Sequence, residues 1–409
     1  MLISAPSQAR LQVLTGFGCF GLFWGAWGAA LPAIEHSTGV TNSQLGIALL
    51  LVGLGALLSM RFTGQLLDKF GYQTIVIALA AFSVAGVLPS IANGMVLLSI
   101  FTLVLGASSG AVDVCINALA IDYERRYEVR VLNTAHATFS ICVVASSLIV
   151  SSLRSLSAPV WALLLVSQVI IFVVTLIVMP SQTPWGPSIT FSRETSKASE
   201  IVVPHERSIG FRDLIIIPAI LYFLGSLGAI AYLVENAWQS WSAILLQNGL
   251  GASATLSSVA PSVFAGSEAV GRLLGNPLGR WVRPRFLLAG GGAIAAVGSV
   301  ITAQTSSVGI ALLSLAVTGI GTSMCAPAIL GLAGRTKSNL GHGATVSSVT
   351  TLSYVGFLVG PALVGILSGL KSLVFAMTVV GGLAAVLAVI SLVGLRLPAA
   401  NSTSLSDVS

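Results

Sequence analysis

The sequence predicts an all-α membrane protein of about twelve transmembrane helices, built as two similar halves of about six helices each. Three observations predict this fold class. Few residues are charged, apolar runs long enough to cross a membrane recur along the whole chain, and residues of the first half recur in the second half at a constant spacing.

The composition excludes a water-soluble globular protein. Only 8% of the 409 residues are charged and 55% are hydrophobic, whereas a soluble protein usually has about 25% charged residues. So few charges cannot cover a water-facing surface of this size. We therefore expect the lipid bilayer to surround most of the chain.

Apolar runs of the length that a spanning helix needs, about 20 residues, follow one another along the chain. The first run is too long for the apolar region of a signal peptide, so we expect it to be retained as a helix. The four cysteines fall within these runs at spacings that indicate neither a disulfide nor a metal site, and we expect no cofactor. The predicted spans are 10–34, 43–67, 73–92, 95–121, 131–153, 159–180, 213–245, 253–278, 286–304, 308–332, 343–369 and 373–396.

The basic residues predict the orientation of these spans. With a cytoplasmic N-terminus, all of the 19 Lys and Arg residues except Arg154 and Lys371 fall on the cytoplasmic side. Cytoplasmic loops of membrane proteins carry an excess of Lys and Arg. We therefore expect a multi-pass protein of the cytoplasmic (inner) membrane with both termini in the cytoplasm. The basic surplus is explained by topology, so no nucleic-acid partner is expected.

The two halves are related by an offset of 211 residues. Trp27 corresponds to Trp238, and Arg61 corresponds to Arg272, with no gap between them. Two repeats of the same direction are typical of transporters that bind a solute at the bilayer midplane and rock their halves around it. A polar, proline-containing stretch separates the repeats, so we predict a first half at 1–180, a cytoplasmic linker at 181–210, a second half at 211–398 and a cytoplasmic tail at 399–409.

The predicted loop between the second and third spans carries a motif, GQLLDKFG at residues 64–71. It resembles the G-x-L-x-D-[RK]-x-G loop of the major facilitators. The resemblance implies the major facilitator fold and a gating role for Gly64, Asp68, Lys69 and Gly71. We expect Gly64 to let helices approach closely and Asp68 to bond a neighbouring helix end in one conformation. Gly279 stands where the second half would carry the acid.

Ionisable residues inside the predicted spans mark candidate functional positions, because each costs roughly 2.5–3.5 kcal/mol at the bilayer centre. Asp113, His136, Glu235 and Glu268 are such residues. We predict that Asp113, His136 and Glu235 take part in proton coupling. Glu268 and Arg272 lie four residues apart on one helix face, and we interpret them as a structural or gating pair.

Polar and aromatic side chains share single faces of the predicted spans 1, 4, 5, 7 and 11. Aromatic rings beside carboxylate, amide and hydroxyl groups suit a polyol, whose C–H faces stack on rings while its hydroxyls form hydrogen bonds. The alternative is that the polar residues join helices and the tryptophans lie at the membrane interface. The predicted solute-binding residues are Trp24, Trp27, Asn117, Asn133, Glu235, Trp238, Gln239 and Tyr354.

The spacing of these residues resembles a narrower group, the fucose permease-like branch of the major facilitators. The quoted spacings are Gly110-x2-Asp113-x3-Asn117, Asn133-x2-His136-x2-Phe139 and Glu235-x2-Trp238-x2-Trp241. The resemblance implies proton coupling through Asp113 and a place for Glu235 at the cavity. Characterised members of the branch import sugars together with protons, but membership does not fix the substrate or the direction of transport.

We therefore predict a secondary active transporter that moves a small polar solute, such as a sugar, by alternating access and with proton coupling. The alternative in the same fold is proton-driven export of an amphipathic metabolite or drug. An enzyme would need clustered acids, histidines or nucleophiles at a loop, and the predicted outer loops hold little beyond Glu35, His36, Arg154 and Lys371. A sensor is a further alternative. We expect the protein to act as a monomer.

Overall fold

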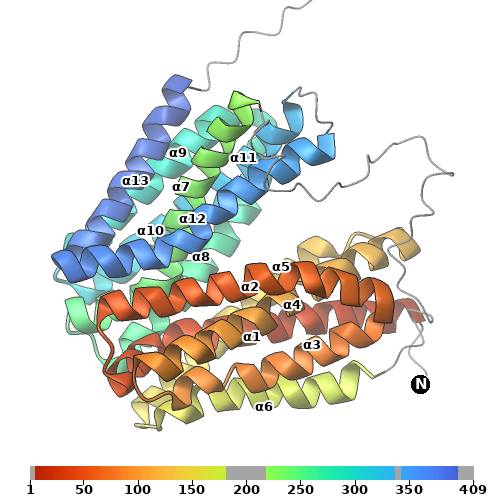
Figure 1. The fold of residues 1–409 in the computed structure, drawn as a ribbon. Helices are drawn as coiled ribbons and strands as arrows, with labels where there is room; N and C mark the ends of the chain where they lie inside the picture. Colours follow the sequence, from red (N-terminus) through yellow and green to blue (C-terminus); the bar gives the residue numbers. More distant parts are fainter. Residues whose placement is uncertain (1–4, 181–217, 337–341, 395–409) are drawn as a thin grey trace, which may run out of the picture.

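The computed structural model describes residues 5–180, 218–336 and 342–394, and these residues form helices and short connections without a strand (Figure 1). The predicted linker 181–210 and tail 399–409 lie outside the described residues. The first half contains α1 (Ala5–Thr38), α2 (Asn42–Phe70), α3 (Tyr72–Ala85), η1 (Leu88–Ile91), α4 (Met95–Tyr127), α5 (Leu132–Ser155) and α6 (Val160–Val178).

The second half begins after the undescribed stretch. It contains α7 (Ala219–Ile244), η4 (Leu245–Gly249), α8 (Ala254–Trp281), α9 (Pro284–Gln304), α10 (Val308–Ser323), α11 (Cys325–Arg335), α12 (His342–Leu370) and α13 (Leu373–Gly394).

The helices have the length and composition of a membrane protein. In the described part of the chain, 11 helical stretches are long and apolar enough to cross a membrane. The helix α8 is also long, at 28 residues, but it carries Glu268 and Arg272 and is more polar than its neighbours. The predicted all-α membrane fold is confirmed.

One predicted span, 308–332, is two helices in the structure, with a break at Met324. The break follows from Pro327, which has no N–H to donate to the carbonyl of Ser323 and whose ring crowds that carbonyl. The chain closes the gap with a shorter turn, in which the Met324 N–H donates to the Gly321 carbonyl oxygen at 3.4 Å.

The same helix pairs pack together in both halves. In the first half α1 packs on α5 and α2 packs on α4, while in the second half α7 packs on α12 and α8 packs on α10. Figure 1 shows the two halves as two groups of helices, one coloured red to yellow and the other green to blue. Helices at equivalent positions of the two groups therefore pack in the same way.

Glycines set how closely the paired helices approach. A Cβ atom added at Gly25 of α1 would overlap the Val143 carbonyl oxygen and the Ser146 Oγ of α5. A Cβ at Gly106 of α4 would overlap the Val52 carbonyl oxygen of α2. Small residues allow such backbone contact between membrane helices.

The two halves are joined at one end of the molecule, where α1 ends and α2 begins, which we call the closed end. There α2 meets α12, and a Cβ added at Gly46 would lie 2.9 Å from the Cα of Gly365. The Asn42 side chain donates to Ser368 Oγ at 2.6 Å. The opposite end, where α1 begins, is the open end, and the two groups of helices spread apart toward it in Figure 1.

Candidate functional site

A cavity of about 230 Å³ lies between the two halves. Its walls come from α1, α2, α4, α7 and α12. The sequence predicted α1, α4, α7 and α12 at the cavity, but it also predicted α5, whose place in the lining is taken by α2. The lining residues are Phe20, Trp24, Trp27, Leu49, Val52, Gly53, Ala56, Leu57, Met60, Ser109, Gly110, Asp113, Tyr232, Asn236, Ser240, Tyr354, Phe357, Leu358 and Pro361.

Aromatic side chains of α1 form one wall of this cavity. Phe20 and Trp24 are one helical turn apart, and their rings meet edge to face with centroids 6.0 Å apart. Behind them, Phe23 stacks on Trp27 with centroids 6.0 Å apart. Gly25 lets α1 pack closely against α5, and Phe20, Trp24 and Trp27 line the space between the halves. The predicted residues Trp24 and Trp27 therefore lie at the cavity.

A second aromatic wall comes from α7 and α12. The ring centroids of Tyr232 and Tyr354 are 5.8 Å apart, and those of Tyr354 and Phe357 are 6.1 Å apart. Asn236 is fixed beside them, because its side-chain amide donates to the Phe357 carbonyl oxygen at 2.5 Å. Tyr354 was predicted from the sequence, whereas Tyr232, Asn236 and Ser240 were not. Their spacing of four residues along α7 was the available signal.

Asp113 is the one carboxylate among the lining residues of the cavity. Its side chain is half-buried on α4. The Asn117 amide, one turn along the helix, donates to Asp113 Oδ1 at 3.1 Å and to its carbonyl oxygen at 2.9 Å. Asn117 therefore holds Asp113 and is not itself part of the lining.

The structure does not bring His136 to Asp113. The His136 ring packs on the edge of Phe17, with centroids 5.0 Å apart, and it lies close enough to Arg272 to feel its charge. No contact between His136 and Asp113 is present among the described residues. Asn133 is exposed toward the open end of α5 and does not line the cavity. Asp113 and His136, which were both predicted to take part in proton coupling, therefore do not form a pair in this conformation.

Two further predictions for α7 need correction. Trp238 is fully buried, and its indole N–H donates to Ser299 Oγ of α9 at 2.8 Å. It packs inside the second half and is not a cavity residue. Gln239 also lies outside the lining, and its amide donates to Glu268 Oε2 at 3.3 Å.

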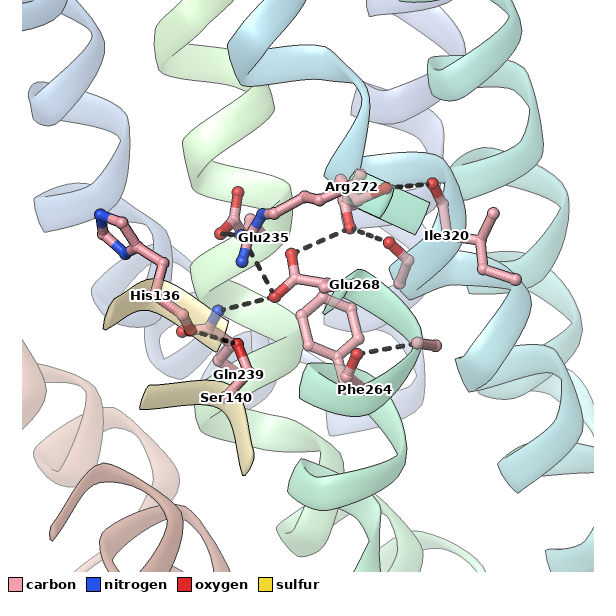
Figure 2. A network of polar contacts seen from close by, with 12 residues as sticks. His136, Ser140, Glu235, Gln239, Phe264, Glu268, Arg272 and Ile320 are labelled. Carbon is pink, nitrogen blue, oxygen red and sulfur yellow. Dashed lines mark hydrogen bonds and ion pairs between the residues drawn. The ribbon is translucent and has the colours of Figure 1, made fainter. Parts of the chain in front are cut away.

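Glu235, Glu268 and Arg272 form a charge network beside the cavity (Figure 2). Arg272 lies 3.2 Å from Glu235 Oε1 and 3.6 Å from Glu268 Oε2. Thr322 of α10 donates to Glu268 Oε1 at 3.3 Å. The predicted pairing of Glu268 with Arg272 is present, but Arg272 lies nearer to Glu235. The sequence could not show this, because Glu235 is on a different helix.

At the closed end, Arg154 of α5 joins the two halves. Its guanidinium donates to Ser258 Oγ at 2.8 Å and to the side chain of Gln247. Nearby, the Asn248 amide of the second half donates to Glu35 Oε2 of the first half at 2.9 Å. In the sequence, Arg154 was one of two exceptions to the basic pattern, and the structure shows that this exception joins the two halves.

The motif at residues 64–71 lies at the open end, where α2 turns into α3. Gly71 has φ 57° and its N–H donates to the Leu67 carbonyl oxygen at 2.8 Å, so the turn requires glycine. Asp68 and Lys69 are exposed. A Cβ at Gly64 would meet no atom within 4 Å, so the expected close approach at Gly64 does not occur here.

Comparison with known proteins gives consistent matches over most of the chain. The sequence model of the Major Facilitator Superfamily matches residues 13–354. An uncharacterized MFS-type transporter of Yersinia pestis is 28% identical over 370 residues, covering 88% of this chain and 90% of that protein. The membrane protein MosC of Rhizobium meliloti is 22% identical over 346 residues, covering 84% and 80%.

Solved structures with the same fold include two transporters. A bacterial homolog of the human lysosomal transporter Spinster, in an inward-facing and unoccupied conformation, has a TM-score of 0.75 at 15% identity and covers 96% of this chain and 97% of its own. The nucleoside transporter NupG has a TM-score of 0.72 at 12% identity, covering 97% and 100%.

Proposed function

Because the chain belongs to the Major Facilitator Superfamily, we propose that this membrane transporter moves a small polar solute, such as a sugar, across the cytoplasmic membrane by alternating access and with proton coupling. The observation that carries the proposal is the cavity between the halves, with two aromatic walls and the carboxyl group of Asp113. Membership of the family makes the chain a transporter rather than an enzyme.

The distribution of basic residues supports an inward-facing orientation. Arg10, Lys69 and Arg125 lie near the open end, whereas Arg154 and Lys371 lie near the closed end. Positive residues favour the cytoplasmic side, so the open end faces the cytoplasm. The similarity to an inward-facing Spinster homolog agrees with a cavity that communicates with the cytoplasm in this conformation. Both chain termini are then cytoplasmic.

The chemistry of the lining supports an uncharged, partly apolar solute. Rings of Trp24, Tyr232 and Tyr354 offer flat apolar surfaces, while Asn236 and Ser240 offer hydrogen bonds. A sugar presents both kinds of surface. No Lys or Arg occurs among the described lining residues, so nothing in the wall compensates the charge of an anion.

Asp113 supports proton coupling in the same cavity. Burial of a carboxylate favours its neutral form, and contact with water favours its ionised form. A cavity that alternates between occluded and open states would therefore load and release a proton at Asp113. Asn117 supplies a hydrogen bond to the carboxylate that persists in either state, because both residues lie on α4.

The function is tested by a thermal-shift screen of sugars, nucleosides, amino acids and cationic drugs on the purified protein. A ligand that binds the folded state raises its apparent stability by mass action. The best ligand is then given to proteoliposomes with and without a proton gradient. Accumulation of a sugar that an uncoupler abolishes supports the proposal. Movement of the ligand that does not depend on the gradient would contradict proton coupling, and hits only among the cationic drugs would contradict a small polar solute.

The aliphatic residues that line part of the cavity favour a second candidate function, which is proton-driven export of an amphipathic solute. Leu49, Leu57, Met60 and Leu358 line the side of the cavity formed by α2 and α12. The same proteoliposomes separate the candidates by direction. An importer that moves its solute together with protons accumulates the solute inside the vesicles when protons flow inward. An exporter that exchanges its solute for protons accumulates the solute inside when protons flow outward.

A further inference from the structure

The charge network beside the cavity contains two acids and one base. The side chains of Glu235 and Glu268 are 11% and 2% exposed, while that of Arg272 is 45% exposed. Arg272 reaches both carboxyl groups (Figure 2). One guanidinium neutralises one carboxylate. If both acids were ionised, the network would keep an uncompensated negative charge in a buried place, which costs several kcal/mol.

The two carboxyl groups are neighbours, because the same Arg272 Nη2 lies 3.2 Å from Glu235 Oε1 and 3.6 Å from Glu268 Oε2. An ionised carboxylate only accepts hydrogen bonds, so a bond between two carboxyl groups needs a proton on one of them. The remaining contacts stabilise Glu268 in place, because the Gln239 amide and the Thr322 hydroxyl donate to its two oxygens at 3.3 Å each.

We propose that Glu235, Glu268 and Arg272 form a proton-binding site that holds one proton between its two carboxyl groups. The site lies in the second half, on α7 and α8, and is separate from Asp113 on α4. Arg272 sets the number of bound protons. While it contacts both acids one proton suffices, and when it withdraws the second acid must also take up a proton to remain neutral.

Among the described residues, no Lys or Arg other than Arg272 forms an ion pair with Glu235 or Glu268. Tyr232 of α7, Tyr354 of α12 and Cys325 of α11 lie close enough to feel the charge of Glu235. His136 of α5 lies near Arg272 from the other half. Because His136 and Arg272 belong to different halves, rocking of the halves changes the environment of the guanidinium. That the site takes part in proton-coupled transport rests on the proposed function. That the site binds a proton does not depend on it.

Infrared spectroscopy of the purified protein tests the site, because the carbonyl stretch of a protonated carboxyl group is resolved from that of a carboxylate. At neutral pH, Glu268→Gln should lose one protonated carboxyl group relative to the wild type, and so should Glu235→Gln. In each variant the remaining acid and Arg272 form a neutral pair that needs no proton. Arg272→Gln should instead double the protonated carboxyl signal of the site.

Two controls accompany the measurement. Glu128→Gln removes an exposed carboxyl group at the end of α4 and should leave the signal unchanged, and Arg272→Lys should keep the wild-type signal because it keeps the charge. A wild-type signal in both Glu variants would overturn the proposal, even if Arg272→Gln does not fold. The infrared measurement uses no solute. Its result can therefore contradict the proton-binding site even if proton-coupled transport is observed, and it can support the site even if no solute is identified.

Discussion

Arg154 offers the sharpest test of how this transporter keeps one side shut. Its guanidinium donates to two groups of the opposite half, to Ser258 Oγ at 2.8 Å and to the side chain of Gln247. A third contact, to Ser257 Oγ, is longer at 3.4 Å. Replacing Arg154 by Gln removes the donors that reach across the interface and leaves the helix otherwise intact.

The expected magnitude follows from these contacts. A hydrogen bond from a charged group contributes about 1.5–3 kcal/mol, and partial exposure of Arg154 places the bonds to Ser258 and Gln247 near the lower limit. Their loss should destabilise the closed end by about 2–3 kcal/mol. At about 1.4 kcal/mol per tenfold change, the ratio of closed to open molecules at this end falls by roughly 30- to 150-fold.

Pulsed electron–electron distance measurements report this ratio. Spin labels on Ser155 and Ser253, exposed positions of the two halves at the closed end, should show one short distance in the wild-type background. With Arg154→Gln a longer distance should become a major population. Lys371→Gln is the matched control, because Lys371 is the other basic residue at this end and lies over the Phe375 ring of its own half, 4.8 Å from the centroid. Identical distance distributions for the two variants would refute the reasoning.

Four further predictions concern the cavity, the loop and the packing. Asp113→Asn imitates the protonated carboxyl group, so it should keep solute binding and counterflow exchange but lose gradient-driven accumulation; full accumulation in proteoliposomes would rule out Asp113 as the essential proton carrier. Trp24→Ala should weaken the equilibrium affinity for the solute by about tenfold, through loss of roughly 1.4 kcal/mol of ring contact, and an unchanged dissociation constant would place the solute elsewhere. Asp68→Asn should slow transport more than it weakens ligand binding, which parallel uptake and binding assays compare; an equal loss in both would mean that Asp68 does not act in gating. Gly25→Ala should lower the melting temperature, since its Cβ overlaps α5, whereas Gly64→Ala meets open space and should not; equal melting temperatures would contradict the packing argument.

The general fold could be predicted because it depends on local sequence properties. Spans follow from the length of apolar runs, whereas the pairing of the helices had to come from the structure. The break at Met324 could also be read locally from Pro327, although the apolar run passes through it without interruption. Gly64 shows the limit of a motif, because a small residue permits a close approach but only the partner helix decides whether one occurs.

The candidate site was only partly predictable because helix faces do not identify their neighbours. On α7 the stripe of Tyr232 and Asn236 lies about 60° from the stripe of Glu235 and Gln239. Both stripes are polar, and only packing shows which one reaches the cavity. The stripe of Glu235 and Gln239 instead contacts Arg272 and Glu268 of α8. This contact between two helices cannot be predicted from the spacing of residues along one helix. Trp24, Trp27, Asp113 and Tyr354 were predicted correctly, because the stripes chosen on α1, α4 and α12 are the ones that line the cavity.

The contact of α2 with α12 at Gly46 and Gly365 has a consequence for leakage. A protein that couples transport to a proton gradient dissipates that gradient if a chain of water molecules ever runs through it. Where two backbones touch, a column of water has no room and protons have no hydrogen-bonded path to follow. Side chains at these positions would hold the helices apart and leave gaps that water could fill. We therefore expect these two glycines at the closed end to exclude water and so to prevent proton leakage. A larger residue at either position should make membranes containing the protein permeable to protons even without solute.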